Sequence, residues 1–288
     1  MFWITSKPYS FPPTNIQNLP IEILYQIAAW CCPKDITQFS MASKLFSPIR
    51  NELFAKSKTL IIQNGINLDE IPDLIKNNIQ SIKVTKRNFN YTDLKIFKNL
   101  IHLYLHSNRI DDVSPLLYLI KLEKLYLCSN RIDDVSQLPS LINLSVLNLY
   151  SNNIADISPL KSLVNLKELS LGSNAISDIS PVESLINLQK LYIGSNQIVD
   201  ITALAPLTKL QELSLEENEI DDIYPLASLI NLRELFLYQN EIIDVEPLRN
   251  LFQLNCRYFS FDIISQPCRT LFGRESNNGY FFIQIFNL

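Results

Sequence analysis

The feature that most constrains this chain is a 22-residue unit repeated seven times between Leu100 and Leu251. Each unit follows the pattern L-x-x-L-x-L-x-x-N-x-I-x-D-[IV], and residues 166–179, LKELSLGSNAISDI, are its clearest copy. The asparagine of the pattern recurs at a spacing of 22, at Asn108, Asn130, Asn152, Asn174, Asn196, Asn218 and Asn240. A repeat of this length predicts an array in which each unit packs only against its neighbours.

The repeated pattern resembles the leucine-rich repeat family. Its tail, D-I-S-P-L-x-x-L, resembles the 22-residue subtype found in bacterial internalins and in a eukaryotic group of phosphatase regulators. The resemblance implies an α/β fold, a curved solenoid with a parallel β-sheet on its concave face. Short 3₁₀, helical or extended segments would form the convex face.

The fixed positions of the unit have structural explanations. The L-x-L core predicts a short strand, in which Leu169 and Leu171 point inward while Ser170 and Gly172 point outward. The asparagine side chain is expected to bond backbone groups where the chain leaves the strand. The aspartate of the pattern is expected to cap the following return segment rather than to bind metal, because hard cations need six or more converging oxygens. This aspartate recurs at Asp112, Asp134, Asp156, Asp178, Asp200, Asp222 and Asp244.

The outward positions of the strands vary between repeats and are therefore the predicted target-binding surface. Exposed aromatic side chains favour protein binding because they offer a large contact area, although an ordinary solvated strand face remains the alternative. Small residues at Ser170, Gly172 and Gly194 predict a shallow dip between two aromatic clusters. The predicted contact residues are His102, Tyr104, His106, Tyr126, Tyr150, Tyr192, Phe236 and Tyr238.

The residue after each repeated asparagine changes from basic to acidic along the array. It is Arg109 and Arg131 in the first two units and Glu219 and Glu241 in the last two. With strands about 4.8 Å apart, this predicts an oriented charge gradient along one edge of the binding face. We expect the gradient to orient an elongated partner with its acidic end toward the arginines.

His102 and His106 flank Tyr104 on the same predicted face, with Cys128 as the nearest further metal ligand. Zinc normally takes four ligands, so a polar contact to a partner is the preferred interpretation and no metal site is expected.

Residues 16–55 change to a helical pattern and predict a small all-α domain after an extended lead-in at 1–15. The segment L-P-I-E-I-L from Leu19, followed by D-I and S-K-L-F, resembles the F-box, with departures at Cys31, Cys32 and Met41. The resemblance implies docking to a Skp-type adaptor and, through it, to a cullin–RING ubiquitin ligase. The adaptor-binding residues would be Leu19, Pro20, Ile23, Leu24, Ile27, Ile36 and Phe39.

The array is expected to have atypical ends. Residues 56–99 keep the L-x-L spacing at 60–62 and 82–84 without the asparagine, which indicates degenerate N-terminal capping repeats before the full repeats at 100–253. Residues 254–288 are rich in aromatics and predict a C-terminal cap.

Composition narrows the function further. A net charge of −4 argues against nucleic acid as a partner, and no apolar run suggests a membrane span. The N-terminus lacks the pattern of a secretory signal, so an intracellular, cytoplasmic protein is expected. No catalytic motif is present, and neither a cofactor nor enzymatic activity is expected.

The preferred hypothesis is therefore a substrate receptor of a cullin–RING ligase, monomeric within a hetero-complex. A plain repeat scaffold or phosphatase-regulator-like protein is the alternative. An extracellular adhesion repeat is disfavoured by the missing signal.

Overall fold

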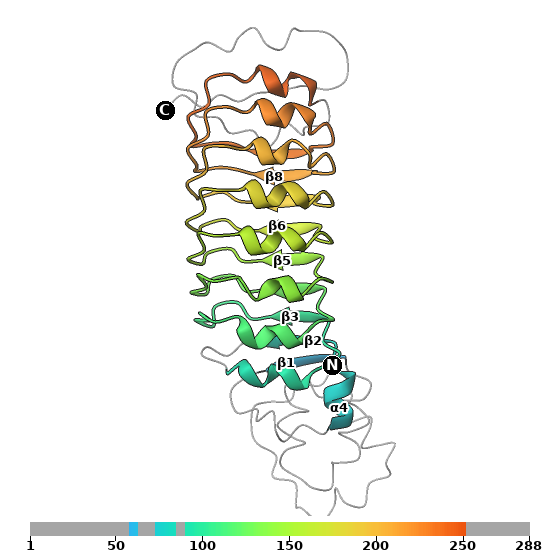
Figure 1. Cartoon of the computed structure of the whole chain (residues 1–288). Helices are drawn as coiled ribbons and strands as arrows, with labels where there is room; N and C mark the ends of the chain where they lie inside the picture. The colour runs from blue at the N-terminus through green and yellow to red at the C-terminus, as the bar shows by residue number, and fades with distance from the viewer. Residues whose placement is uncertain (1–57, 63–72, 85–89, 252–288) are drawn as a thin grey trace, which may run out of the picture. The chain divides into compact units, whose positions relative to one another are not determined.

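The computed structural model describes residues 58–62, 73–84 and 90–251. Nine parallel strands form one sheet in chain order, which confirms the predicted fold class (Figure 1). The strands are β1 (Thr59–Ile62), β2 (Ser81–Val84), β3 (His102–Tyr104), β4 (Lys124–Tyr126), β5 (Val146–Asn148), β6 (Glu168–Ser170), β7 (Lys190–Tyr192), β8 (Glu212–Ser214) and β9 (Glu234–Phe236).

A 3₁₀ helix follows each strand from β2 onward, and those after β2 to β8 return the chain to the next strand. Pro lies in the first turn of most of these helices, because its fixed φ suits a helix start and its missing N–H is not needed there. The 3₁₀ helices are η4 (Thr92–Ile96), η5 (Ser114–Tyr118), η6 (Leu138–Ser140), η7 (Ser158–Ser162), η8 (Ser180–Ser184), η9 (Thr202–Leu204), η10 (Tyr224–Ser228) and η11 (Glu246–Asn250).

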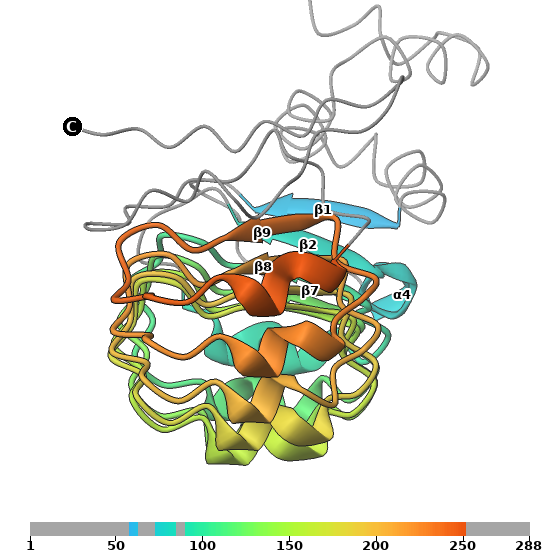
Figure 2. The ribbon, with the colours of Figure 1, turned by 90° about the horizontal axis from the view of Figure 1, so that it is seen from above.

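The repeat array curves with its sheet on the inside. Seen from above, the middle repeats lie further toward the 3₁₀ side than the first and last repeats do, so the strands line the concave face (Figure 2). The only α-helix of the described residues, α4 (Asp73–Asn78), belongs to a separate compact unit.

Columns of aliphatic side chains fill the space between the sheet and the 3₁₀ helices. Leu169 and Leu171 are fully buried, as predicted from the alternation of the strand. The buried members of these columns are 0–9% exposed, and Val245 in the last described repeat is half-buried. Each fully buried Leu or Ile contributes about 1.5–3 kcal/mol relative to an exposed one.

The repeated asparagines, here called the turn asparagines (Asn108, Asn130, Asn152, Asn174, Asn196, Asn218 and Asn240), form the predicted ladder. Asn152 donates through Nδ2 to the carbonyls of Leu149, 2.9 Å away in its own repeat, and Leu127, 3.1 Å away in the preceding one. Its Oδ1 accepts from the backbone N–H of Ile132 at 3.0 Å. The ladder therefore pairs backbone groups that the turn would otherwise leave unsatisfied inside the molecule.

The aspartate column also has its predicted structural role. In all seven repeats the aspartate Oδ1 accepts from the backbone N–H two residues on. This N–H belongs to the first residue of the 3₁₀ helix in every repeat except that of Asp134, where η6 begins two residues later. These backbone hydrogen bonds hold the pKa of Asp134, Asp156 and Asp200 below their ordinary value.

The first two strands depart from the regular unit. Leu60 and Ile62 in β1 and Ile82 and Val84 in β2 are buried like the later strand leucines. β1 pairs with β2 at an offset of 22 residues (Thr59 with Ser81), whereas β2 pairs with β3 at an offset of 21 (Ser81 with His102). The F-box-like segment at 16–55 and the predicted cap at 254–288 lie outside the described residues.

Candidate protein-binding surface

The outward residues of the strands form three parallel columns on the concave face. His102, Tyr104 and His106 point to this face in the first full repeat, and all three are partly exposed. Tyr192, Phe236 and Tyr238 are also partly exposed on it. The eight residues that the sequence assigned to target binding therefore lie along the concave face from the first full repeat to the last, and their role in binding stays a prediction.

Two of the predicted aromatic residues make a platform at the N-terminal end of the array. The rings of Tyr104 and Tyr126 stack with their centroids 4.7 Å apart and their planes within 7°. This distance follows from the spacing of about 4.8 Å between paired strands. Burial raises the pKa of Tyr126, and the neighbouring Tyr104 raises it further. The pair therefore presents a flat aromatic surface.

The predicted dip in the middle of the face is wrong, because neighbouring side chains cover its floor. Gly172 and Gly194 are buried. The Tyr150 ring lies over Gly172, where an added methyl group would come within 3.1 Å of Tyr150 Cδ2. The carboxylate of Glu216 lies against Gly194 in the same way. Without a Cβ on either glycine, the larger neighbours fold over the strand, and Tyr150 itself remains 47% exposed.

Next to these glycines, the face carries a network of hydrogen bonds that the sequence analysis did not identify. Lys190 Nζ lies 2.7 Å from Glu212 Oε1, and the Tyr192 hydroxyl donates to the other carboxylate oxygen. Burial opposes the charge of Glu212, but the hydrogen bonds from Lys190 and Tyr192 lower its pKa. Burial and the bond to Glu212 raise the pKa of Tyr192. Comparing the residues at the first position of each strand between repeats would have pointed to this network.

Acidic side chains gather in the repeat that contains β8. The Ser214 hydroxyl donates to Glu216, and the Ser195 hydroxyl donates to Glu217 at 2.7 Å. Together with Glu212 and the exposed Glu219, these carboxylates make the C-terminal half of the concave face acidic. Burial, then Glu216 and Glu217, raise the pKa of Tyr238 beside them.

The residues of the predicted charge gradient, Arg109, Arg131, Glu219 and Glu241, are all exposed. The backbone N–H of Arg131 donates to Ile110 in the preceding repeat at 2.7 Å, and those of Glu219 and Glu241 make the equivalent bond at 2.9 Å. These bonds fix the residues at one position per repeat along the edge where the strands end.

A second asparagine column runs along the opposite edge, just before the strands, and the sequence analysis missed it. We call its members the edge asparagines: Asn143, Asn165, Asn187 and Asn231. Each donates through Nδ2 to a carbonyl of the preceding repeat at 2.8–2.9 Å. Lys121 and Lys209 occupy this position in two other repeats and donate to Asn99 and Asn187. The 22-residue spacing of these asparagines was the available signal.

Cys128, the suggested third metal ligand, is a free, half-buried thiol whose pKa is raised by burial. Within the described residues, no group of three or more His, Cys, Asp or Glu side chains could hold a metal ion. No helix in that part of the chain is long and apolar enough to cross a membrane. The residues assigned to adaptor binding, Leu19 to Phe39, lie outside the described residues.

The repeat geometry agrees with comparison to known families. The family model for leucine-rich repeats in two copies matches residues 98–140, 120–162, 142–184, 164–206 and 208–250, together more than half of the chain. The chain belongs to the leucine-rich repeat family. No curated protein matches it significantly.

Solved structures of bacterial leucine-rich repeat proteins are similar to this chain. Internalin C2 from Listeria monocytogenes is 41% identical, with a TM-score of 0.61, covering 64% of this chain and 82% of the internalin. A second internalin from that organism, inlF, is 32% identical, with a TM-score of 0.58 and coverage of 66% and 62%. A leucine-rich repeat protein from Leptospira interrogans is 25% identical, with a TM-score of 0.56 and coverage of 67% and 51%. This chain therefore spans less than two thirds of the last two proteins. Its fold is typical of protein–protein interaction scaffolds.

Proposed function

We propose that the protein binds a partner protein on its concave face, with the Tyr104–Tyr126 platform as the main apolar contact. The stacked pair carries this proposal, because two rigid aromatic rings offer contact area with little loss of conformational entropy on binding. The covered glycines leave Tyr150 and Glu216 as further contact groups on the same face.

The distribution of charge supports an oriented partner. Arg109 and Arg131 lie beside the aromatic platform, whereas Glu216, Glu217 and Glu219 lie four to five repeats further along. A partner segment with an acidic end and a basic end would be attracted in one orientation and repelled in the other. We propose that its acidic end lies toward the arginines.

The platform is tested by affinity capture with the full chain carrying Tyr104→Ala and Tyr126→Ala. Captured partners should be lost, because truncation of central aromatic contacts weakens binding by about 2 kcal/mol or more. Tyr118→Ala with Tyr224→Ala is the matched control, since these tyrosines are 61% and 63% exposed on the 3₁₀ helices η5 and η10. Loss of the same partners in the control would contradict the proposal.

The orientation is tested separately by charge reversal. Arg109→Glu with Arg131→Glu should slow association with the captured partner and make the remaining binding less sensitive to salt. Arg249→Glu is the control. Arg249 lies away from this edge and already pairs with Glu246 at 2.6 Å. An unchanged association rate in the double variant would remove the oriented partner from the proposal.

A second function is favoured by the F-box-like pattern of residues 16–55. We propose that this segment docks to a Skp-type adaptor, so that the array would present its target to a cullin–RING ubiquitin ligase. Its support is the sequence pattern alone, L-P-I-E-I-L with D-I and S-K-L-F at F-box spacing.

Pull-down of the full chain with a purified Skp-type adaptor tests this role. Binding that is lost in Leu19→Asp and in Pro20→Ala would support a ligase receptor. Absence of binding by the unaltered chain would favour the alternative, a repeat scaffold or phosphatase-regulator-like protein without a ligase role.

A further inference from the structure

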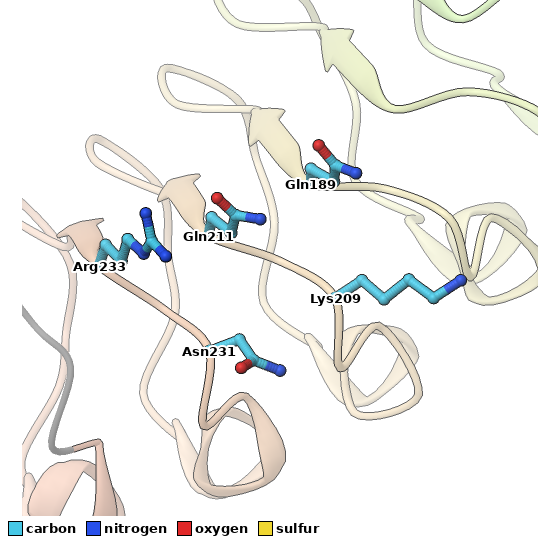
Figure 3. A pocket seen from close by; sticks show the side chains of 5 residues that line it. All are labelled: Gln189, Lys209, Gln211, Asn231 and Arg233. Atoms are coloured by element: carbon cyan, nitrogen blue, oxygen red, sulfur yellow. The ribbon is translucent and has the colours of Figure 1, made fainter.

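A cavity of about 310 Å³ lies on the edge where β7, β8 and β9 begin, at the opposite ends of the strands from the charge gradient. Gln189, Gln211 and Arg233 each immediately precede one of these strands and form a column across three repeats (Figure 3). Lys209 and Asn231 reach the cavity from the turns before the strands. Three consecutive repeats therefore contribute to one polar site.

The residues that line the cavity carry positive charge and no carboxylate. Two are cations and three are carboxamides. Lys209 Nζ donates to the neutral oxygen of Asn187 at 2.7 Å, so its charge is not compensated by that bond. The Arg233 guanidinium has no ion-pair partner within the described part of the chain, unlike Arg249, which pairs with Glu246. The cavity is therefore suited to an anion.

The cavity also coincides with a local departure from the repeat. Ile186 and Ile230 belong to a line of exposed aliphatic residues just before the edge column, 53% and 57% exposed, and Thr208 interrupts this line. In the same repeat Lys209 interrupts the edge asparagines. The repeat architecture needs neither Thr208 nor Lys209 at these positions. The two changes together therefore indicate that the repeat is modified here.

Lys121 occupies the position equivalent to Lys209 in a repeat that does not line the cavity. It makes the same 2.7 Å bond to an asparagine of the preceding repeat, Asn99. The residues that precede the strands around it are Ile101 and Glu123, in place of Gln189 and Gln211. An apolar and an acidic group thus stand where the cavity has amides. Lys121 is a matched control for Lys209.

We propose that this cavity binds an acidic peptide segment of a partner protein. Arg233 and Lys209 would pair with Asp or Glu carboxylates, and the guanidinium could form two parallel bonds to one of them. The three carboxamides both donate and accept, so they match the N–H and C=O groups of a peptide backbone. A fully ionised phosphate monoester offers only acceptors to them, and inorganic phosphate is too small to pair with amides from three repeats at once. The site rests on the proposed function only in that its ligand is a protein.

The probe is a fluorescent peptide of eight glutamates, titrated with the full chain and followed by anisotropy. Arg233→Gln and Lys209→Gln should each weaken binding by about tenfold, the loss expected for one charge-assisted hydrogen bond. Lys121→Gln and Arg249→Gln should leave it unchanged. Equal weakening by Lys121→Gln would show general attraction to positive charge and overturn the proposal.

Two further arms separate the other outcomes. The Arg109→Glu, Arg131→Glu variant should still bind the peptide at this cavity. The cavity proposal and the proposal of an oriented partner on the concave face can therefore fail separately. Inorganic phosphate should compete only weakly. If phosphate displaces the fluorescent peptide as effectively as the unlabelled glutamate peptide does, the cavity is a small-anion site and the peptide assignment is wrong.

Discussion

Two asparagine columns with the same 22-residue spacing border the sheet, and they tolerate change very differently. The turn asparagines are unbroken from Asn108 to Asn240 and are buried or half-buried. The edge asparagines are mostly exposed and are replaced by lysine at Lys121 and Lys209. After Asn108, each turn member pairs several backbone groups, as Asn152 does, whereas an edge member such as Asn165 pairs one.

The difference shows that periodicity alone does not measure structural importance. A buried backbone N–H or C=O without a partner destabilises the fold by about 1–3 kcal/mol, whereas water can pair the same group at an exposed edge. The edge column is therefore free to acquire other side chains, and the cavity at Lys209 lies where it has done so.

The largest expected effect is at the centre of the buried column. Asn152→Ala should destabilise the protein by about 2 kcal/mol, because it leaves the buried N–H of Ile132 without its partner. It also removes one of the two amide donors to each of the carbonyls of Leu127 and Leu149, which keep their bonds from Asn130 and Asn174. Urea unfolding followed by circular dichroism measures the change.

The matched substitution at the edge is Asn165→Ala, which removes one exposed bond to the Ile142 carbonyl. It should destabilise the protein by about 0.5 kcal/mol. Similar unfolding midpoints for Asn152→Ala and Asn165→Ala would show that burial does not separate the two columns.

The first turn asparagine offers an intermediate case. Asn108 is 5% exposed, but its Oδ1 is a buried acceptor without a partner among the described residues, and its Nδ2 donates to the His106 carbonyl. Asn108→Ala should therefore destabilise the protein by only about 1 kcal/mol in the same urea experiment. A loss as large as that of Asn152→Ala would mean that its oxygen is paired in solution.

A smaller effect is expected from the aspartate caps at low pH. The pKa of Asp156 is lowered by its bond from the Ser158 N–H, so its contribution is present above the unfolded value of about 3.9 and is lost as pH falls through the folded pKa. Asp156→Asn keeps an acceptor oxygen without the titrating charge. The urea midpoint of this variant should fall less steeply than that of the unaltered protein between about pH 5 and pH 2. Equal slopes would contradict a native-state shift at Asp156.

Much of this architecture could be predicted from the sequence because each fixed position repeats a simple requirement. Buried leucines, turn asparagines and capping aspartates follow from strand alternation and from unpaired backbone groups. The stacking of Tyr104 on Tyr126 follows from equal positions on adjacent strands. The edge asparagines were equally periodic, but they lie between two leucines of the pattern and were not compared as a column.

Features that depend on side-chain direction could not be predicted in this way. The sequence shows small residues at Gly172 and Gly194 but not that Tyr150 and Glu216 turn over them. The Lys190–Glu212–Tyr192 network similarly depends on three rotamers from two strands. To predict the cavity from the sequence, one would have to recognise that Gln189 and Arg233, two repeats apart, line the same site on one edge.

A substitution that should gain stability sharpens the comparison most, because it should separate architecture from binding. Lys209→Asn restores the edge column, and the new amide could donate to the Ile186 carbonyl as Asn187 does to that of Val164. We expect a gain of about 0.5 kcal/mol in urea unfolding together with weaker binding of the glutamate peptide. Lys121→Asn should give the same gain without the binding loss. A Lys209→Asn protein that is no more stable but binds the peptide normally would place Lys209 in neither role, and the edge column would then vary without consequence.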